Sequence, residues 1–299
     1  MPLNTTPMGF DSDGTRCAAW LTLPREPGPH PLVVLAHGFG ANHTMSLDQY
    51  EQHFASAGIA TLAFDYRHTG ESGGLPRQRL SLRRHRQDIC AAIEFAGSVP
   101  ELDSTRIALW GTSLGAMHVL KVAAGRDDLA AVIVQCPIVD GLATVHRLGF
   151  GAALRIAPAI LTDSLRRLLG ATPRYVPIVG PPGSMAAVTI DGAQEGWNGV
   201  VSPGGSFDNR VGASDVLGVA VTSAVRSARD IAAPLLVCVS QRETLMHPRH
   251  AVTVAQRAPL GDARYYDSDH FDVYHPPLLD TVLTDQTAFL RRCFDAVHA

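Results

Sequence analysis

A serine set between two glycines, in the Gly-Thr-Ser-Leu-Gly segment at 111–115, is the part of this chain best suited to covalent chemistry. An apolar run typical of a buried strand (107–110) precedes it, and an apolar run with helical character (114–124) follows. At a sharp turn from strand to helix, the serine backbone is strained and its hydroxyl projects from the sheet edge, and the two glycines avoid collisions. We therefore predict that Ser113 is a nucleophile, with a plain glycine–serine helix cap as the alternative.

A serine hydroxyl is a weak nucleophile unless a base accepts its proton. In this arrangement the base is a histidine late in the chain, after the last strand. His270 follows the expected strand at 263–266 and is flanked by Asp269 and Phe271. We predict His270 as the base; His275, five residues further on and next to a proline, is the local rival.

A carboxylate must orient this imidazole and stabilise its protonated form. Glu243 lies in the turn after the expected strand at 235–239, so the order serine, acid, histidine along the chain is the one that such a site uses. Asp140, shortly after the expected strand at 130–136, is the alternative acid.

Two backbone N–H groups must stabilise the oxyanion that forms during acyl transfer. The first is expected from Leu114, the residue after the nucleophile. The second is expected from Phe39, in the loop His37-Gly38-Phe39-Gly40 that follows the strand at 31–36. A plain glycine-rich turn is the alternative interpretation of that loop.

The elements that must position these residues alternate between strand and helix. Runs that are apolar on both faces are separated by helical segments, which indicates an α/β fold with a mostly parallel central sheet and helices on both faces. This alternation of strand and helix patterns stops at residue 138 and resumes near 231. The residues between them show only weak helical patterns, at 145–156 and 163–169, and many prolines and glycines. We predict a core formed by 1–137 and 231–299 and an inserted cap at 138–230.

Four segments together resemble the α/β-hydrolase family over nearly the whole chain apart from the insertion. They are His37-Gly38-Phe39-Gly40, Phe64-Asp65-Tyr66-Arg67-His68-Thr69-Gly70-Glu71-Ser72, Trp110-Gly111-Thr112-Ser113-Leu114-Gly115 and Asp269-His270-Phe271-Asp272. More narrowly, the chain is similar to bacterial hydrolases grouped with dienelactone hydrolase-like and X-Pro dipeptidyl-peptidase-like proteins. It departs from the family pattern at His68, where a glycine is usual.

The resemblance implies two-step acyl transfer through an acyl-enzyme. We expect a serine hydrolase acting on an ester or thioester of a small to medium, mainly apolar acyl substrate. An acyl or polyketide transferase or cyclase with the same triad is one alternative, and a non-catalytic binding member of the fold is another. Trp197, Phe150 and Phe207 are candidates for lining an acyl pocket, or else they pack within the cap.

Composition predicts which partners are absent. The 299 residues are 46% hydrophobic with a net charge of −3, which speaks against nucleic acid. No apolar run reaches the roughly 20 residues of a membrane-spanning helix, and the first nine residues lack the features of a secretory signal. We expect a cytoplasmic protein with a small-molecule substrate and no membrane partner. The oligomeric state stays open, and a homodimer is one of the options.

Neither a cofactor nor a metal is expected. A dinucleotide fingerprint beginning at Gly38 fails because His43 occupies its third glycine position, and a Walker A loop fails because leucine precedes Lys121. His247 and His250 have the spacing of a metal pair, but no carboxylate or cysteine completes a ligand set. The five cysteines are scattered and form no CxxC pair.

Overall fold

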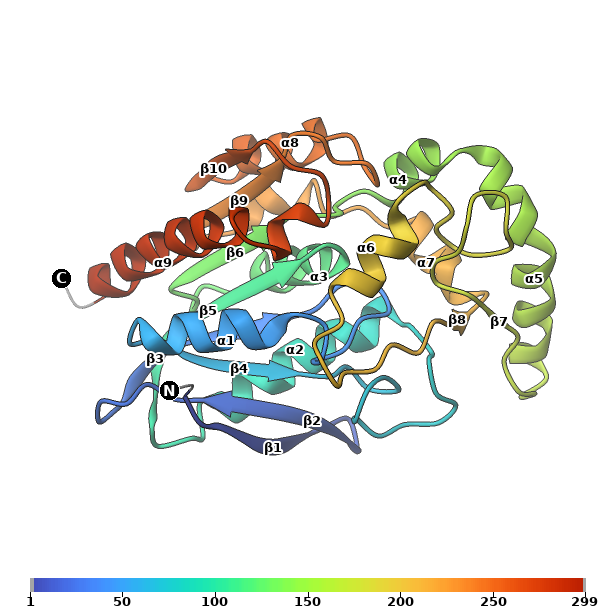
Figure 1. Cartoon of the computed structure of the whole chain (residues 1–299). Helices are drawn as coiled ribbons and strands as arrows, with labels where there is room; N and C mark the ends of the chain where they lie inside the picture. The colour runs from blue at the N-terminus through green and yellow to red at the C-terminus, as the bar shows by residue number, and fades with distance from the viewer. Residues whose placement is uncertain (1–2, 298–299) are drawn as a thin grey trace.

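An eight-stranded sheet runs through the centre of the computed structural model, which describes residues 3–297 (Figure 1). The strand order is β1-β2-β4-β3-β5-β6-β9-β10. The strands are β1 (Thr5–Ser12), β2 (Thr15–Thr22), β3 (His30–Ala36), β4 (Ala60–Phe64), β5 (Leu102–Thr112), β6 (Ala131–Gln135), β9 (Leu235–Ser240) and β10 (Gly261–Tyr266). The strands from β4 to β10 in this order are parallel, and β1 and β2 form an antiparallel edge.

The central strands are buried because their sequences are apolar on both faces. Every residue of β4, β6 and β9 is buried, as is the second half of β5. Continuous apolar runs of this kind fit a parallel sheet that is covered on both sides. The exposed residues of β10 fit its position at the edge.

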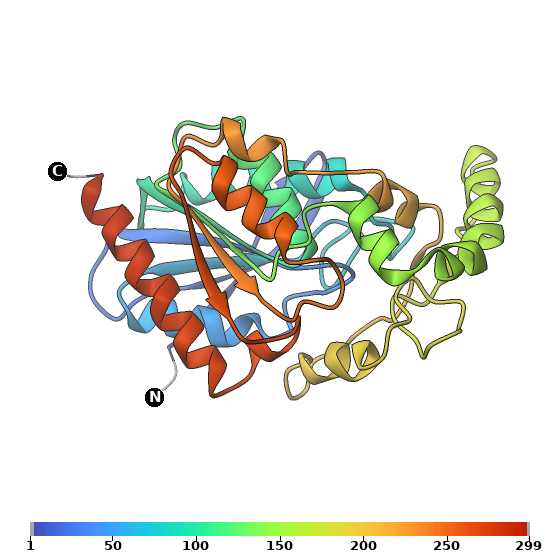
Figure 2. The ribbon, with the colours of Figure 1, turned by 90° about the horizontal axis from the view of Figure 1, so that it is seen from above.

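Helices cover both faces of the sheet (Figure 2). One face carries α1 (Leu47–Ser56) and α9 (Leu278–Ala296), which contact each other. The other face carries α2 (Leu82–Ala96), α3 (Leu114–Ala123) and α8 (Arg249–Arg257). This architecture confirms the predicted α/β class with a mostly parallel sheet.

The segment 138–230 leaves the sheet after β6 and returns before β9, and it lies beyond the carboxyl ends of the parallel strands (Figure 1). It contains α4 (Gly141–Leu148), α5 (Phe150–Leu168), β7 (Tyr175–Val176), α6 (Ala193–Gly199), β8 (Val211–Gly212), α7 (Asp215–Ala220) and the 3₁₀ turn η1 (Ser227–Asp230). We call 138–230 the insertion.

The helices of the insertion differ from the weak patterns in the sequence. Instead of separate helices at 145–156 and 163–169, α5 is continuous and contains Pro158. Proline removes one helical N–H, but Pro158 is exposed, so water can hydrate the carbonyl that loses its donor. Among residues 3–297, no single helix has both the length and the apolar composition to cross a membrane; α4 and α5 pass that test only as a pair, bent by 110°.

A buried ionic cluster joins the insertion to the core. Arg79, in the loop before α2, binds the Asp163 carboxylate of α5 at 3.0 Å and the Asp215 carboxylate of α7 at 2.9 Å. Asp163 also accepts hydrogen bonds from the backbone N–H groups of Arg174 and Ser214. Because each buried charge has several partners, the cluster fixes α5 and α7 relative to the core.

Three buried histidines, His37, His85 and His118, pack around the ring of Tyr66. His85 stacks on the Tyr66 ring and shares a 3.2 Å hydrogen bond with His118, and His37 contacts the edge of the same ring. Desolvation lowers the pKa of His37 to about 4 and that of His118 to about 3, and it lowers the pKa of His85 strongly. These imidazoles are therefore neutral at physiological pH.

The buried histidines predict acid sensitivity. An unfolded histidine binds its proton near pH 6.5, whereas folded His37 and His118 do not until about pH 4 and about pH 3. Unfolding thus takes up protons below about pH 6.5, and the free energy of unfolding falls as the pH decreases. The free energy of unfolding, measured with urea from about pH 7 to about pH 5, should fall less steeply with decreasing pH for His118→Gln than for the wild type. If the free energy of unfolding depended on pH equally in both proteins, His118 would not be held neutral by the fold.

Candidate active site

Ser113 sits at the turn between β5 and α3 with a backbone conformation that non-glycine residues rarely adopt, at φ 54° and ψ −122°. The glycines around it permit close approaches. A Cβ on Gly115 would overlap the carbonyl oxygen of Ala36 and lie 2.6 Å from that of His37. A Cβ on Gly111 would lie 2.7 Å from the Gly115 carbonyl oxygen. The turn that carries Ser113 therefore packs directly against the end of β3.

The structure brings Ser113, His270 and Glu243 together. His270 Nε2 lies 3.0 Å from Ser113 Oγ, and His270 Nδ1 lies 2.7 Å from Glu243 Oε2. The other carboxylate oxygen of Glu243 accepts a 2.8 Å hydrogen bond from the Leu245 N–H. The three side chains are 7%, 2% and 4% exposed, so bulk water does not compete for these contacts. Such a chain can pass the serine proton to the imidazole and stabilise the charge that results.

The two rival residues lie elsewhere. Asp140 is the N-cap of α4, and its carboxylate accepts a 2.9 Å hydrogen bond from the Ala143 N–H. His275 is exposed and follows the short 3₁₀ helix η2 (Asp272–Tyr274). Neither residue contributes a hydrogen bond to the chain of side chains that begins at Ser113.

Two backbone segments lie next to Ser113, the start of α3 and the loop after β3. Leu114 is the first residue of α3, so its N–H has no earlier helical carbonyl to bind. The loop after β3 passes close to the nucleophile, because a Cβ on Gly38 would lie 2.9 Å from Ser113 Cβ. Gly40, at φ +65°, turns this loop where any side chain would overlap Ile178. The next residue after Gly38 is Phe39, so its N–H lies in the loop that borders the serine.

A buried polar network holds the backbone of Ser113 in place. The Ser113 N–H donates to the Gln135 carbonyl oxygen at 3.0 Å. The Gln135 side chain binds Tyr50 Oη at 2.7 Å and Gln286 at 2.8 Å, and the Trp110 indole donates to Gln286 at 3.0 Å. Sequence reasoning missed this network; its one visible signal is a glutamine at the end of an otherwise apolar strand.

A thiol beside the serine is unsuited to be a nucleophile. Cys136 Sγ lies 3.4 Å from both Thr112 Oγ1 and Tyr274 Oη. Burial raises the pKa of the Cys136 thiol to about 12, so the reactive thiolate is absent at neutral pH. Thr112 and Tyr274 are also hydrogen-bonded to each other.

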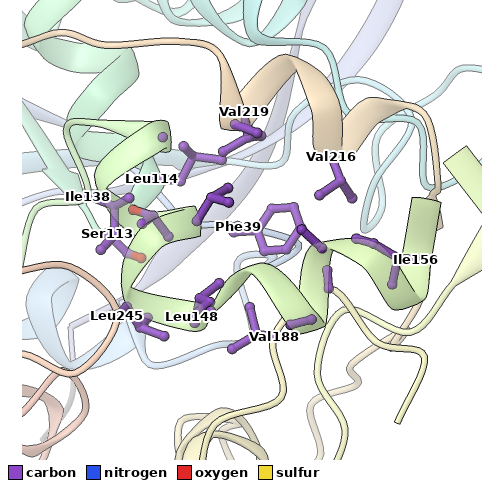
Figure 3. A pocket seen from close by; sticks show the side chains of 18 of the residues that line it. Phe39, Ser113, Leu114, Ile138, Leu148, Ile156, Val188, Val216, Val219 and Leu245 are labelled. Atoms are coloured by element: carbon purple, nitrogen blue, oxygen red, sulfur yellow. The ribbon is translucent and has the colours of Figure 1, made fainter. Parts of the chain in front are cut away.

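A cavity of about 100 Å³ opens from Ser113 into the insertion (Figure 3). Ser113 lies at one end of it, and Ile156 of α5 and Val216 of α7 lie at the other. Apart from Ser113 and Thr144, its lining is apolar or glycine: Phe39, Leu114, Ile138, Gly141, Val145, Leu148, Gly149, Ala152, Ala153, Ile156, Ala187, Val188, Trp197, Val216, Val219, Ala220 and Leu245. We call it the apolar cavity.

A second cavity, of about 40 Å³, lies on the histidine side of Ser113. His270, Phe271 and Tyr274 contribute to its wall, and Phe39 and Trp197 line both cavities. We call it the histidine-side cavity. Ser113 is therefore accessible from two cavities of different size and chemistry.

Of the three aromatic residues that were candidates for lining a pocket or for packing within the cap, the structure places one at a cavity. Trp197 lines both cavities. The expectation for Phe150 is wrong, because its side chain is exposed on α5, and Phe207 packs against the core rather than lining either cavity. Apolar character alone does not distinguish a residue on the inner face of a helix from one on its outer face.

No group of three or more histidine, cysteine or acidic side chains that could hold a metal ion occurs between residues 3 and 297. His247 Nδ1 accepts a hydrogen bond from the Arg249 N–H, and a 3.4 Å contact joins His250 Nε2 to the Arg249 guanidinium. These histidines have local roles at the start of α8.

Comparison with known proteins agrees with this architecture. The family model of the X-Pro dipeptidyl-peptidase (S15 family) matches residues 13–157. The quorum-quenching protein AidA of Acinetobacter baumannii is 34% identical over 283 residues, covering 95% of this chain and 93% of the relative. The chain therefore belongs to the family of this relative, and its fold is that of the α/β hydrolases.

Two further relatives extend the comparison. A thiohydrolase of Eupenicillium brefeldianum is 26% identical over 202 residues, covering 67% of this chain and 60% of the relative. The crystal structure of the α/β hydrolase GrgF from Penicillium sp. sh18 has a TM-score of 0.84 at 22% identity and covers 98% of this chain and all of that one. The shared fold therefore extends through the insertion.

The packing around Ser113 predicts a strong effect of one added methyl group. Gly115→Ala would place a Cβ against two backbone carbonyl oxygens that cannot rotate away, so we expect a loss of about 3 kcal/mol in the free energy of unfolding. Gly125→Ala is the control, because its nearest neighbour would lie at 3.7 Å. Urea unfolding of both variants tests this, and equal stabilities would contradict it.

Proposed function

We propose that this protein is a serine hydrolase that cleaves an ester or thioester with a small to medium, mainly apolar acyl group. The observation that carries the proposal is the hydrogen-bonded chain Ser113–His270–Glu243 at the mouth of the apolar cavity. A buried, aligned hydroxyl, imidazole and carboxylate form the arrangement that activates serine in acyl transfer.

In the first step, Ser113 Oγ attacks the substrate carbonyl carbon while His270 Nε2 takes the hydroxyl proton. The Glu243 carboxylate accepts a hydrogen bond from the Nδ1–H of His270 and stabilises the imidazolium. The N–H groups of Phe39 and Leu114 stabilise the oxyanion. When the carbonyl re-forms, the bond to the leaving group breaks, and His270 returns the proton to that group. Water then repeats the sequence on the acyl-enzyme, releasing the acid and restoring Ser113.

The two cavities indicate where the leaving group and the acyl chain of the substrate would bind. The leaving group must lie next to the imidazole that protonates it, and the histidine-side cavity is the one lined by His270. The acyl chain then extends into the apolar cavity. The apolar cavity is the larger of the two, at about 100 Å³ against about 40 Å³, so it can take the longer part of the substrate.

The names of the relatives support a carbonyl substrate with a good leaving group, because they include a quorum-quenching protein, thiohydrolases and polyketide transferases. Transfer of the acyl group to a nucleophile other than water is the second candidate function. It requires that nucleophile to enter the histidine-side cavity, whose small volume favours water. Product analysis with and without an added small alcohol distinguishes hydrolysis from transfer.

A fluorophosphonate probe tests the nucleophile. It should label the wild type covalently and leave Ser113→Ala unlabelled, because the probe reacts with an activated serine. His270→Ala should label far more slowly, since its serine has lost the base. Gel fluorescence gives the rates, and labelling that survives Ser113→Ala would rule out the proposed nucleophile.

A pair of carboxylate variants tests the acid. Glu243→Gln should lower kcat by roughly 10⁴-fold, because the amide no longer holds the imidazole in the required tautomer. Asp140→Asn should change kcat less than about twofold, since asparagine caps a helix as well as aspartate does. Steady-state hydrolysis of a p-nitrophenyl ester measures both. The opposite pattern would move the acid to Asp140.

Two neighbouring residues of α7 test the acyl site. Val216→Phe fills the far end of the apolar cavity, whereas Leu217→Phe adds the same ring to an exposed position. Each buried methylene contributes about 0.8 kcal/mol, so losing room for two should lower kcat/KM for an octanoyl ester by more than about tenfold. The acetyl ester should be unaffected, and Leu217→Phe should resemble the wild type. Equal losses for both esters would contradict this acyl site.

A further inference from the structure

The outer face of α5 carries an apolar stripe that nothing in the chain covers. Its residues recur at alternating intervals of four and three, as in the seam of a coiled coil. They are Phe150, Leu154, Ala157, Leu161, Ser164 and Leu168. The buried residues of the inner face have the same spacing, at Ala152, Ile156, Ala159 and Asp163. The helix is thus apolar toward the protein and also toward solvent.

The exposure is concentrated rather than scattered. Seven large apolar side chains between residues 142 and 169 are each more than half exposed: Leu142, Phe150, Leu154, Leu161, Leu165, Leu168 and Leu169. Single exposed apolar residues are ordinary on protein surfaces, but several large ones along one face of a single helix mark an interaction site. Figures 1 and 2 place α5 at the outer end of the insertion, away from the sheet, where a partner can approach it.

We propose that this stripe is a homodimer interface in which α5 pairs antiparallel with α5 of a second copy. A two-fold axis near Ala159 sets Phe150 opposite Leu168 of the second copy. The same axis sets Leu154 opposite Ser164 and Leu161 opposite Ala157. In two of the three layers a large side chain faces a small one, which is the self-complementary packing that a two-fold interface requires.

The area is sufficient for a stable dimer. Covering the four large side chains of the stripe, which are 64% to 84% exposed, removes on the order of 600 Å² from water on each copy, the lower end of the area per partner in specific interfaces. A lipid surface would need no alternation of large and small residues. It would instead need free cationic groups. Of the three arginines of α5, Arg166 binds Thr172 and Arg167 binds Asp215, so only Arg155 is left for a lipid headgroup.

The interface has a consequence for the acyl site that rests on the proposed function, although the pairing itself does not. The inner face of α5 lines the apolar cavity through Ala152, Ala153 and Ile156. Its main contacts are with α4, α7 and β7, all within the insertion. A second helix against the outer face would hold this wall of the cavity in place.

Mass measurement in solution tests the proposal independently of activity. Light scattering during size-exclusion chromatography should give twice the chain mass for the wild type. It should give the single-chain mass for the double variant Leu154→Glu/Leu161→Glu. Leu260→Glu, at an exposed leucine outside the insertion, should remain dimeric. Circular dichroism should show that the exposed substitutions leave the fold intact.

A cross-linking experiment tests the register. The double variant Leu154→Cys/Ser164→Cys should form covalent dimers on oxidation, since the two cysteines face each other across the axis. Neither single variant should do so, and the native cysteines are buried or half-buried. A monomeric wild type overturns the proposal, also if that monomer sediments with phosphatidylglycerol vesicles. A dimer that persists after both glutamate changes, or a double variant that links no better than the single ones, overturns this interface.

Discussion

The contact of Gly115 with the carbonyl oxygens at the end of β3 is the constraint on which the site depends. It lets α3 begin directly against the sheet, so that Ser113 is held at φ 54° with its hydroxyl toward His270. The same approach brings the loop after β3 beside the serine. The strain at Ser113 persists because its N–H is fixed to the Gln135 carbonyl and the glutamine side chain is itself held in a buried network.

The side chains of Ser113, His270 and Glu243 are buried, which strengthens the electrostatic contacts between them. Glu243 and His270 are almost completely buried, so their interaction is little screened by water. The insertion adds an apolar cavity on one side of the serine, while the histidine side has a smaller one. In the proposed function, the leaving group lies on the side of His270 and the acyl chain lies in the apolar cavity. The insertion would then contribute much of the acyl site, and the core the groups for proton transfer.

The sequence predicted the fold class correctly because buried parallel strands are continuous apolar runs, which are easily recognised. It also named Ser113, His270 and Glu243, which the structure brings within hydrogen-bonding distance, because such residues follow strand ends. It favoured Glu243 but kept Asp140 as the alternative acid, since both follow a strand. It missed β1, whose exposed edge carries little apolar signal, and it misjudged Phe150, because α5 is apolar on two faces.

Intact-mass spectrometry of rapidly quenched reactions with an octanoyl p-nitrophenyl ester tests the central claim most directly. If Ser113 is the nucleophile, the protein gains one octanoyl group before steady state, and peptide mapping locates that group on Ser113. The added mass should appear together with a burst of one p-nitrophenolate per active site. Turnover without any covalent acyl group, or an acyl group on another residue, would contradict the account.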